Sequence, residues 1–243
     1  MKHYIEFELK NTFGYSIGMI VGGLLPLMLA ISGYHASNDI EQNRELAEMT
    51  FTMCLPMIPL GLVMLPFTIA FAKDIEEGIF IRFSLFGYTK LKQLFAKFIS
   101  ILFMVSGICL LYFLVLQVVL PLPVPSLAAL LLMIFGILIV TISFYFLAFT
   151  IAWFFKGFNT VQGIAMVAYF GIAILTGTIG SFEFTGIMKK ISDFIPFNSF
   201  RMELANHWTT TSFDMSNVFV HLVVFMVFTI LLFCIANIYS IKK

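Results

Sequence analysis

The residues best suited to chemistry gather in one stretch, residues 72–98, which lies between two long apolar runs. Asp74, Glu76 and Glu77 open this stretch, and basic residues follow them. Paired carboxylates can act as general acid and base when burial pushes their pKa values apart. Here the neighbouring bases favour a charge-balanced, solvated face instead. On composition, the stretch is either an ordinary connecting loop or a short helix that docks a partner.

Other patterns that carry chemistry do not occur in the sequence. It has no Gly-Lys pair, which excludes the phosphate-binding motif G-x-x-x-x-G-K-[ST], and it has no H-E-x-x-H. Cys54, Cys109 and Cys234 all lie in apolar runs, without the spacing of a disulfide framework or a metal site. We therefore predict no catalytic residue, no metal site and no cofactor bound by this chain, and an intramembrane enzyme is the least favoured class.

The composition is typical of a protein that lies in a membrane. The chain is 60% hydrophobic and 11% charged, whereas soluble domains are about 45–50% apolar and about 25% charged. Six apolar runs have about the length that a helix needs to cross a bilayer. They are residues 14–34, 49–72, 94–120, 126–153, 159–181 and 216–239.

Secondary transporters usually carry acids or bases inside their spans, and we expect none in the interior of these six. His221 is the one histidine within a span, and we interpret it as an interface or packing residue rather than a proton relay. Energy for any transport would then have to come from outside the chain.

The distribution of basic residues predicts the orientation. With six spans, both termini share a side with residues 72–98, and that side collects ten of the fourteen Lys and Arg residues. These are Lys2, Lys10, Lys73, Arg82, Lys90, Lys92, Lys97, Lys156, Lys242 and Lys243. Because basic residues concentrate on the cytoplasmic side, we expect a multi-pass protein of the cell membrane with both termini in the cytoplasm.

The expected fold is one all-α membrane domain, residues 1–243, with six transmembrane helices. An amphipathic helix at the membrane interface (1–13) precedes the first span. A cytoplasmic helix lies within 73–92, between spans two and three. Short outer-leaflet helices, broken at Pro196, lie within 181–215, between spans five and six.

The cytoplasmic helix is expected over residues 74–85, with its acids in the first turn, where the helix dipole favours them. Its apolar stripe consists of Ile75, Ile79, Phe83 and Phe86, while Phe80, Ile81 and Leu85 cover further directions. A helix that only lay on a membrane surface would need one apolar face. The additional apolar surface is what a docking element requires.

Two further patterns concern the first two spans. Pro56, Pro59 and Pro66 fall in the second span, which predicts either a bent packing helix or a deformable wall beside a pathway. Gly18 and Gly22 form a G-x-x-x-G pattern that allows close helix approach, either within the chain or against a second copy.

In order and spacing, these features resemble the type-2 ABC export permeases. Glu77–Gly78, followed by Arg82, looks like the start of that family's cytoplasmic coupling helix, and Lys97 stands where the family opens its third span. The segment FGYT (residues 86–89) stands in place of a T-P-x-S turn, without the proline. Near the end, ISDFIPFNSF resembles the family's step before the last span, with Pro196–Phe197 at the step. The resemblance covers essentially the whole chain.

The resemblance implies an exporter permease that pairs with a second permease copy, as homodimer or heterodimer, and with two ABC ATPase subunits that bind ATP and Mg. It also implies that the coupling helix docks in a groove of the ATPase. The residues assigned to that contact are Asp74, Glu76, Glu77, Gly78, Arg82, Phe83, Phe86 and Tyr88.

The expected cargo is amphipathic or hydrophobic, such as peptides, because the chain is rich in Phe and Met. A small permease without an outer domain resembles bacterial exporters of antimicrobial or cytolytic peptides, including those of phenol-soluble modulins. The bilayer is the other expected partner, and no nucleic-acid partner is expected. The alternative functions are a non-transporting immunity or sensor subunit and, third, a secondary transporter.

Overall fold

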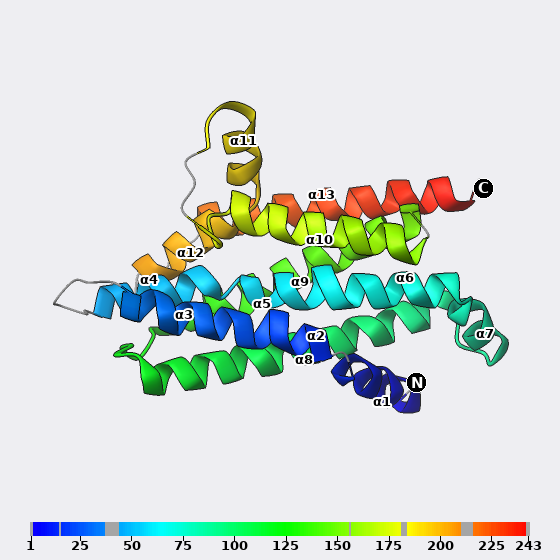
Figure 1. Ribbon diagram of the computed structural model, residues 1–243, viewed down its shortest axis with the longest axis horizontal. Helices are drawn as coiled ribbons and strands as arrows, with labels where there is room; N and C mark the ends of the chain where they lie inside the picture. The colour runs from blue at the N-terminus through cyan, green and yellow to red at the C-terminus, as the bar shows by residue number, and fades with distance from the viewer. Residues whose placement is uncertain are drawn as a thin grey trace.

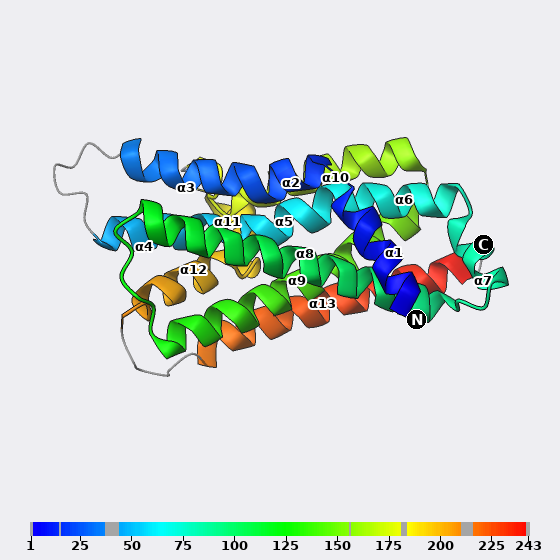
Figure 2. The same ribbon diagram turned by 90° about the horizontal axis from the view of Figure 1, so that it is seen from below.

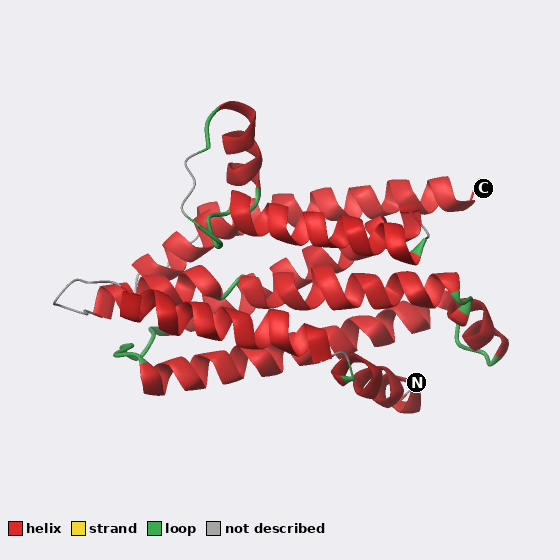
Figure 3. Cartoon of the chain, viewed as in Figure 1, coloured by secondary structure: helices red, strands yellow, loops and turns green. Residues whose placement is uncertain are grey.

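The computed structural model describes residues 2–14, 16–36, 44–155, 157–180, 184–209 and 216–241. Within these ranges every regular element is a helix (Figure 3). Most helices run along the long axis of an elongated bundle (Figures 1 and 2). The prediction of an all-α protein is therefore confirmed.

The first part of the chain makes four helical stretches. They are α1 (Lys2–Phe13); α2 (Ser16–Met19), η1 (Ile20–Leu24) and α3 (Leu25–Ala36); α4 (Arg44–Cys54), α5 (Met57–Leu62), η2 (Val63–Phe67) and α6 (Thr68–Glu76); and α7 (Ile79–Leu85). The remainder comprises α8 (Lys90–Val119), α9 (Leu127–Phe155), α10 (Phe158–Leu175), α11 (Gly186–Phe194), α12 (Phe197–Asn206) and α13 (Ser216–Ile241).

Five helices of the described chain are long and apolar enough to cross a bilayer. They are Arg44–Glu76, Lys90–Val119, Leu127–Phe155, Phe158–Leu175 and Asn217–Ile238. A shorter apolar helix, Ile20–Ala36, falls in the first expected span. This set is compatible with a multi-pass membrane protein, whereas the count of six spans stays a prediction.

The helix Arg44–Glu76 forms the centre of the bundle. In its most apolar window 94% of residues are buried, against 22% in Phe158–Leu175 and in Asn217–Ile238. A helix that is apolar on all sides is suited to such a position, because it has no face that needs water. Its neighbours include α8, α9, α10 and η1, and Figure 2 shows α5 and α6 enclosed among them.

The three prolines interrupt this central helix. Pro56 precedes α5, Pro59 lies in its first turn, and Pro66 lies in the wider π-helical turn η2. Proline lacks the N–H that would complete the ladder, so the helix is broken at residues 55–56 and widened at 63–67. The Thr68 hydroxyl donates to the Val63 carbonyl at 2.9 Å and so gives η2 an additional bond.

The G-x-x-x-G pattern packs within the chain. A Cβ atom built on Gly18 would lie 2.9 Å from Cγ of Pro66, and one built on Gly61 would lie 2.8 Å from Cα of Gly22. Any side chain at Gly22 would collide with Leu62. The small residues thus let η1 and α5 approach at backbone distance.

The two ends of the bundle differ. One end carries α1, α7 and the last turns of α13 (Figure 1); we call it the α7 end. The opposite end, the α12 end, carries the α8–α9 connection and α12 (Figures 1 and 2). Near it, α11 and α12 meet at Pro196, with Phe197 fully buried, and α11 stands out across the bundle axis.

Candidate functional site

The segment of residues 74–85, predicted as a single cytoplasmic helix, belongs to two helices. α6 ends at Glu76, and Gly78 takes a φ of 68° before α7 begins at Ile79. A left-handed glycine is a common helix terminator because it has no Cβ to strain. The prediction of one helix over residues 74–85 is therefore wrong. Asp74 and Glu76 lie in the last turn of α6, so the dipole of α7 does not account for them.

Asp74 is instead part of a buried ion cluster. Nζ of Lys97, in α8, lies 2.6 Å from Oδ2 of Asp74 and 3.0 Å from Oε2 of Glu8, in α1. The Tyr4 hydroxyl donates to Oε1 of Glu8 at 2.8 Å. The exposed fractions of Glu8, Asp74 and Lys97 are 2%, 7% and 7%. We call these four residues the Lys97 cluster; it joins α1, α6 and α8.

The electrostatics of the cluster keep its hydrogen bonds in place. Burial raises the pKa of the Tyr4 phenol, and the Glu8 carboxylate raises it further. The phenol therefore stays protonated and remains the donor to Glu8. Lys97 faces two carboxylates, and the Phe80 ring lies 5.9 Å from its Nζ.

The sequence analysis missed this cluster, because it placed Lys97 at the opening of the third span and sought no acid partner for it. α8 begins at Lys90, so Lys97 lies two turns inside the helix rather than at its opening. A lysine at this depth in an apolar helix must be paired, which was the signal that could have prompted a search for acids. The residues missed were Tyr4 and Glu8, spaced four apart on one face of α1.

α7 is held against the bundle by its inner face. Nε2 of Gln93 donates to the carbonyls of Phe80 and Tyr88, at 3.0 Å and 2.8 Å. The ring of Tyr4 lies 5.1 Å from that of Phe83 and 4.7 Å from that of Tyr88. Of the residues predicted to contact a partner, Phe83 and Tyr88 therefore face α1.

The outer face of α7 has no partner among the described residues. Ile81, Leu85 and Phe86 are 67%, 82% and 78% exposed, and Arg82 is exposed beside them. α7 lies beyond the ends of the long helices (Figure 1). We call these four residues the α7 face; it combines apolar side chains with one guanidinium.

The junction of α6 and α7 is also joined to α10. Oε2 of Glu76 accepts a hydrogen bond of 2.6 Å from the backbone N–H of Phe158, at the N-terminus of α10. The first N–H groups of a helix lack partners within it and favour negative charge. Glu77 is exposed and pairs with Lys73 at 3.8 Å. Glu76 and Glu77 thus have separate roles.

A cavity of about 200 Å³ lies between α1, α6 and α7. Its lining includes Glu8, Asp74 and Lys97 of the cluster, together with Glu77 and Phe83. The aromatic and polar contacts therefore fix α7 in place, although side chains do not fill all the space between α7, α1 and α6.

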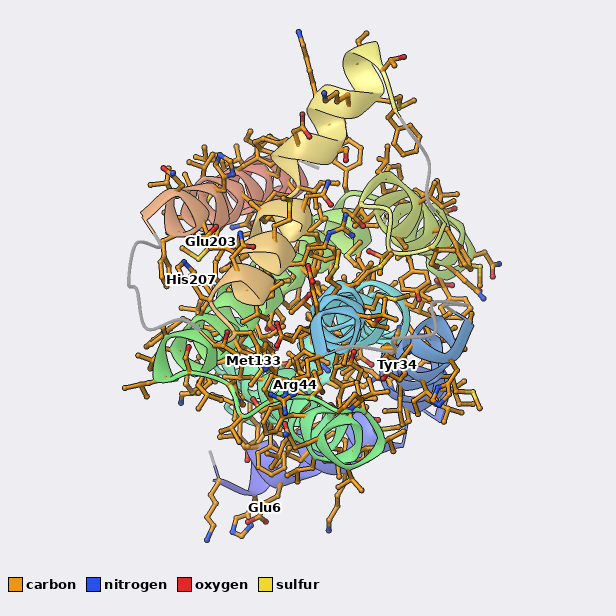
Figure 4. All side chains as sticks on the ribbon, turned by 90° about the vertical axis from the view of Figure 1, so that its left-hand side faces the viewer. Glu6, Tyr34, Arg44, Met133, Glu203 and His207 are labelled. Atoms are coloured by element: carbon orange, nitrogen blue, oxygen red, sulfur yellow. The ribbon has the colours of Figure 1, made fainter. Side chains whose placement is uncertain are left out.

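The α12 end carries other polar contacts. His207 Nε2 lies 2.9 Å from Oε1 of Glu203, one turn away on α12, as Figure 4 shows in a view along the bundle. The Trp208 ring N–H donates to the Pro123 carbonyl at 2.9 Å, which ties α12 to the proline-rich connection before α9. His221 lies on an exposed face of α13.

Within the described ranges, no group of three or more His, Cys, Asp or Glu side chains could hold a metal ion. In comparisons with known proteins, no protein-family model matches the chain, and a search of curated proteins finds no match to it.

Proposed function

We propose that this chain is the membrane-spanning permease subunit of an ATP-driven exporter, of the type-2 ABC permease kind. The observation that carries the proposal is the α7 face. It presents Ile81, Arg82, Leu85 and Phe86 outward from the end of the bundle. An exposed apolar patch that includes an arginine is typical of a protein-binding site.

The proposed partner is an ATP-hydrolysing subunit that binds α7 on the cytoplasmic side, with a second permease copy completing the assembly. Movement of the ATPase would displace α7, and the contacts around α7 would pass this displacement to other helices. Phe83 and Tyr88 contact Tyr4 of α1. Gln93 of α8 is hydrogen-bonded to the backbone of α7, and Glu76 is hydrogen-bonded to the first residue of α10. A short helix fixed at several points can act as such a lever because its own hydrogen bonds keep it rigid.

The proposed moving element is the central helix. It is already broken before Pro56 and widened around Pro66, and π-helical turns often lie at functional sites. The helix reaches α7 directly through α6, so a shift of α7 changes the geometry below Pro66. The proposed cargo is amphipathic or hydrophobic, such as a peptide, which suits a chain rich in Phe and Met.

The test is recovery of a partner with the tagged full chain from its native membrane in mild detergent. We expect an ATPase carrying the phosphate-binding motif in stoichiometric amount. Leu85→Ser combined with Phe86→Ser should lower its recovery about tenfold, because apolar anchors carry most of the energy of an interface. Val124→Ser is the matched control: it removes an equally exposed apolar side chain, 82% exposed like Leu85, at the opposite end.

Recovery of the chain without an ATPase would contradict the proposal. If the ATPase is recovered but amphipathic peptides neither stimulate its turnover nor appear outside the cell, a non-transporting immunity or sensor subunit becomes the better function.

A further inference from the structure

The Lys97 cluster holds more negative than positive charge. Its two carboxylates, Glu8 and Asp74, share a single cation, Lys97. No other base of the described residues forms an ion pair with either acid. Asp74 also lies in the last turn of α6, where the helix dipole is negative. An excess charge in a buried site costs stability, so the cluster lacks one positive charge.

One oxygen of the cluster remains free for that charge. Oδ2 of Asp74 accepts the hydrogen bond of Lys97, whereas its Oδ1 has no partner among the described residues and is not sealed from solvent. By contrast, Nη1 of Arg201, on α12, has no hydrogen-bond partner and is sealed from solvent. Asp74 is only 7% exposed and lines the cavity of about 200 Å³ between α1, α6 and α7. The cavity is therefore the route by which a cation can reach Oδ1.

The other walls of the cavity suit a cation as well. They include Glu77 and Asn11, and the side-chain amide of Asn11 has no hydrogen-bond partner among the described residues. Glu77 pairs only with Lys73, at 3.8 Å, and about half of its side chain is exposed. Phe7 and Phe83 line the cavity too, with ring centroids 5.8 Å apart. Because aromatic faces attract cations, the cavity offers free oxygens together with favourable apolar surface.

The charges around the cavity indicate the class of cation. Its lining includes three acids, Glu8, Asp74 and Glu77, but two bases, Lys73 and Lys97, which leaves one negative charge. No group of acids in the described part of the chain could hold a metal ion, which favours an organic cation. Pockets for drug-sized ligands measure about 300–1,000 Å³, so this cavity suits a smaller one. A primary ammonium brings one charge and three N–H donors on a narrow carbon chain.

We propose that this cavity binds the primary ammonium group of an alkylamine. The ammonium donates to Oδ1 of Asp74 and to the side-chain oxygens of Asn11 and Glu77, and its carbon chain packs against Phe7 and Phe83. Bound there, it supplies the charge that the cluster lacks. The group can come from a small free amine or from a lysine side chain of a peptide. The site does not depend on an ATPase at α7, so it and the proposed function can fail separately.

The experiment is saturation-transfer NMR of the purified full chain in an uncharged detergent, titrated with n-butylamine at neutral pH, where the amine is protonated. n-Butanol is the uncharged probe of similar size. We expect butylamine to bind about tenfold or more tightly than butanol, because hydrogen bonds between charged groups are the strong ones. Butyltrimethylammonium, which is charged but has no N–H donor, should bind with intermediate affinity. Equal binding of butylamine and butanol would overturn the proposal, and a proton on one carboxylate would then be the missing charge.

Variants locate the site. Asp74→Asn keeps an acceptor for Lys97 but removes the excess charge, so it should abolish the preference for butylamine over butanol. Glu77→Gln changes a half-exposed side chain, which does not endanger folding, and should lower the preference by about threefold. Glu45→Gln, in the exposed first turn of α4, is the charge-matched control and should keep the preference. A preference unchanged in both Asp74→Asn and Glu77→Gln would overturn the assignment to this cavity.

A competition identifies the source of the ammonium. An N-terminally acetylated amphipathic peptide that contains lysine should displace butylamine if the site receives a side chain of a peptide, whereas the same peptide with acetylated lysines should not. If neither peptide displaces butylamine, the ligand is a small free amine. Equal displacement by both peptides would contradict recognition of the ammonium group.

Discussion

Lys97 is buried and Arg201 is partly buried, and the fold treats the two cations in opposite ways. Lys97 has carboxylates from two other helices within 3.0 Å, so its charge serves as a connection between α1, α6 and α8. Arg201 has no acid at all among its described neighbours. A paired buried charge can hold helices together, whereas a partly buried charge without a counter-charge lowers stability.

Lys97→Met should destabilise the protein by about 3–5 kcal/mol, because it leaves two buried carboxylates without a counter-charge. Adding Glu8→Gln and Asp74→Asn should restore much of the loss, since the uncompensated charge is then gone. Unfolding in detergent, followed by circular dichroism at increasing denaturant, measures both. Lys92→Met, on the same helix but exposed, is the control and should change little. A Lys97→Met variant as stable as the control would show that the cluster does not hold α1 in place.

At the scale of the element, the segment between α6 and α8 shows what the spacing of apolar residues can and cannot predict. The apolar spacing from Ile75 to Phe86 indicated helix correctly, and both Gly78 and Gly87 have positive φ, at the ends of α7. The assignment of Asp74 to the outer helix was wrong, because the apolar periodicity continues across the two-residue break at Glu77 and Gly78, which only the left-handed glycine reveals. The pairing of Asp74 with Lys97 depends on how α6 and α8 pack, which spacing along the chain does not encode.

Gly78→Ala should destabilise α7 by about 1 kcal/mol, because alanine is strained at a φ of 68°. Gly163→Ala, in the middle of α10 with open space around it, should stabilise by about 0.5–1 kcal/mol through helix propensity. Melting temperatures of the two variants, measured side by side, should therefore move in opposite directions. A shift of equal sign in both would contradict the assignment of Gly78 as the break between α6 and α7.

At the scale of the whole molecule, the sequence predicted most of the long helices, because a run of about 20 apolar residues has few alternatives in lipid. What it could not predict was which helix lies at the centre, since all of them are apolar and only packing distinguishes them. It also did not separate the α7 face from the residues that hold α7, because both are apolar and lie on the same short helix.

The two ends of the bundle should lie on opposite sides of the membrane, with the α7 end in the cytoplasm. In a chain whose cysteines are replaced, Leu85→Cys and Val124→Cys place single thiols at sites that are both 82% exposed. A thiol reagent that does not cross membranes should label Val124→Cys in intact cells, and Leu85→Cys only after the cells are opened. The reverse result would invert the orientation and rule out a cytoplasmic ATPase at α7.

The central position of the helix Arg44–Glu76 has a consequence for how the protein is made. This helix leaves the ribosome well before α9 and α10, which later pack against α6 and η2. Until those helices are synthesised, we expect its broken turns at residues 55–56 and 63–67 to face hydrocarbon, where unpaired backbone groups are costly. We therefore expect the prolines that interrupt the finished helix to make its insertion the step at which the nascent chain depends most on an insertase.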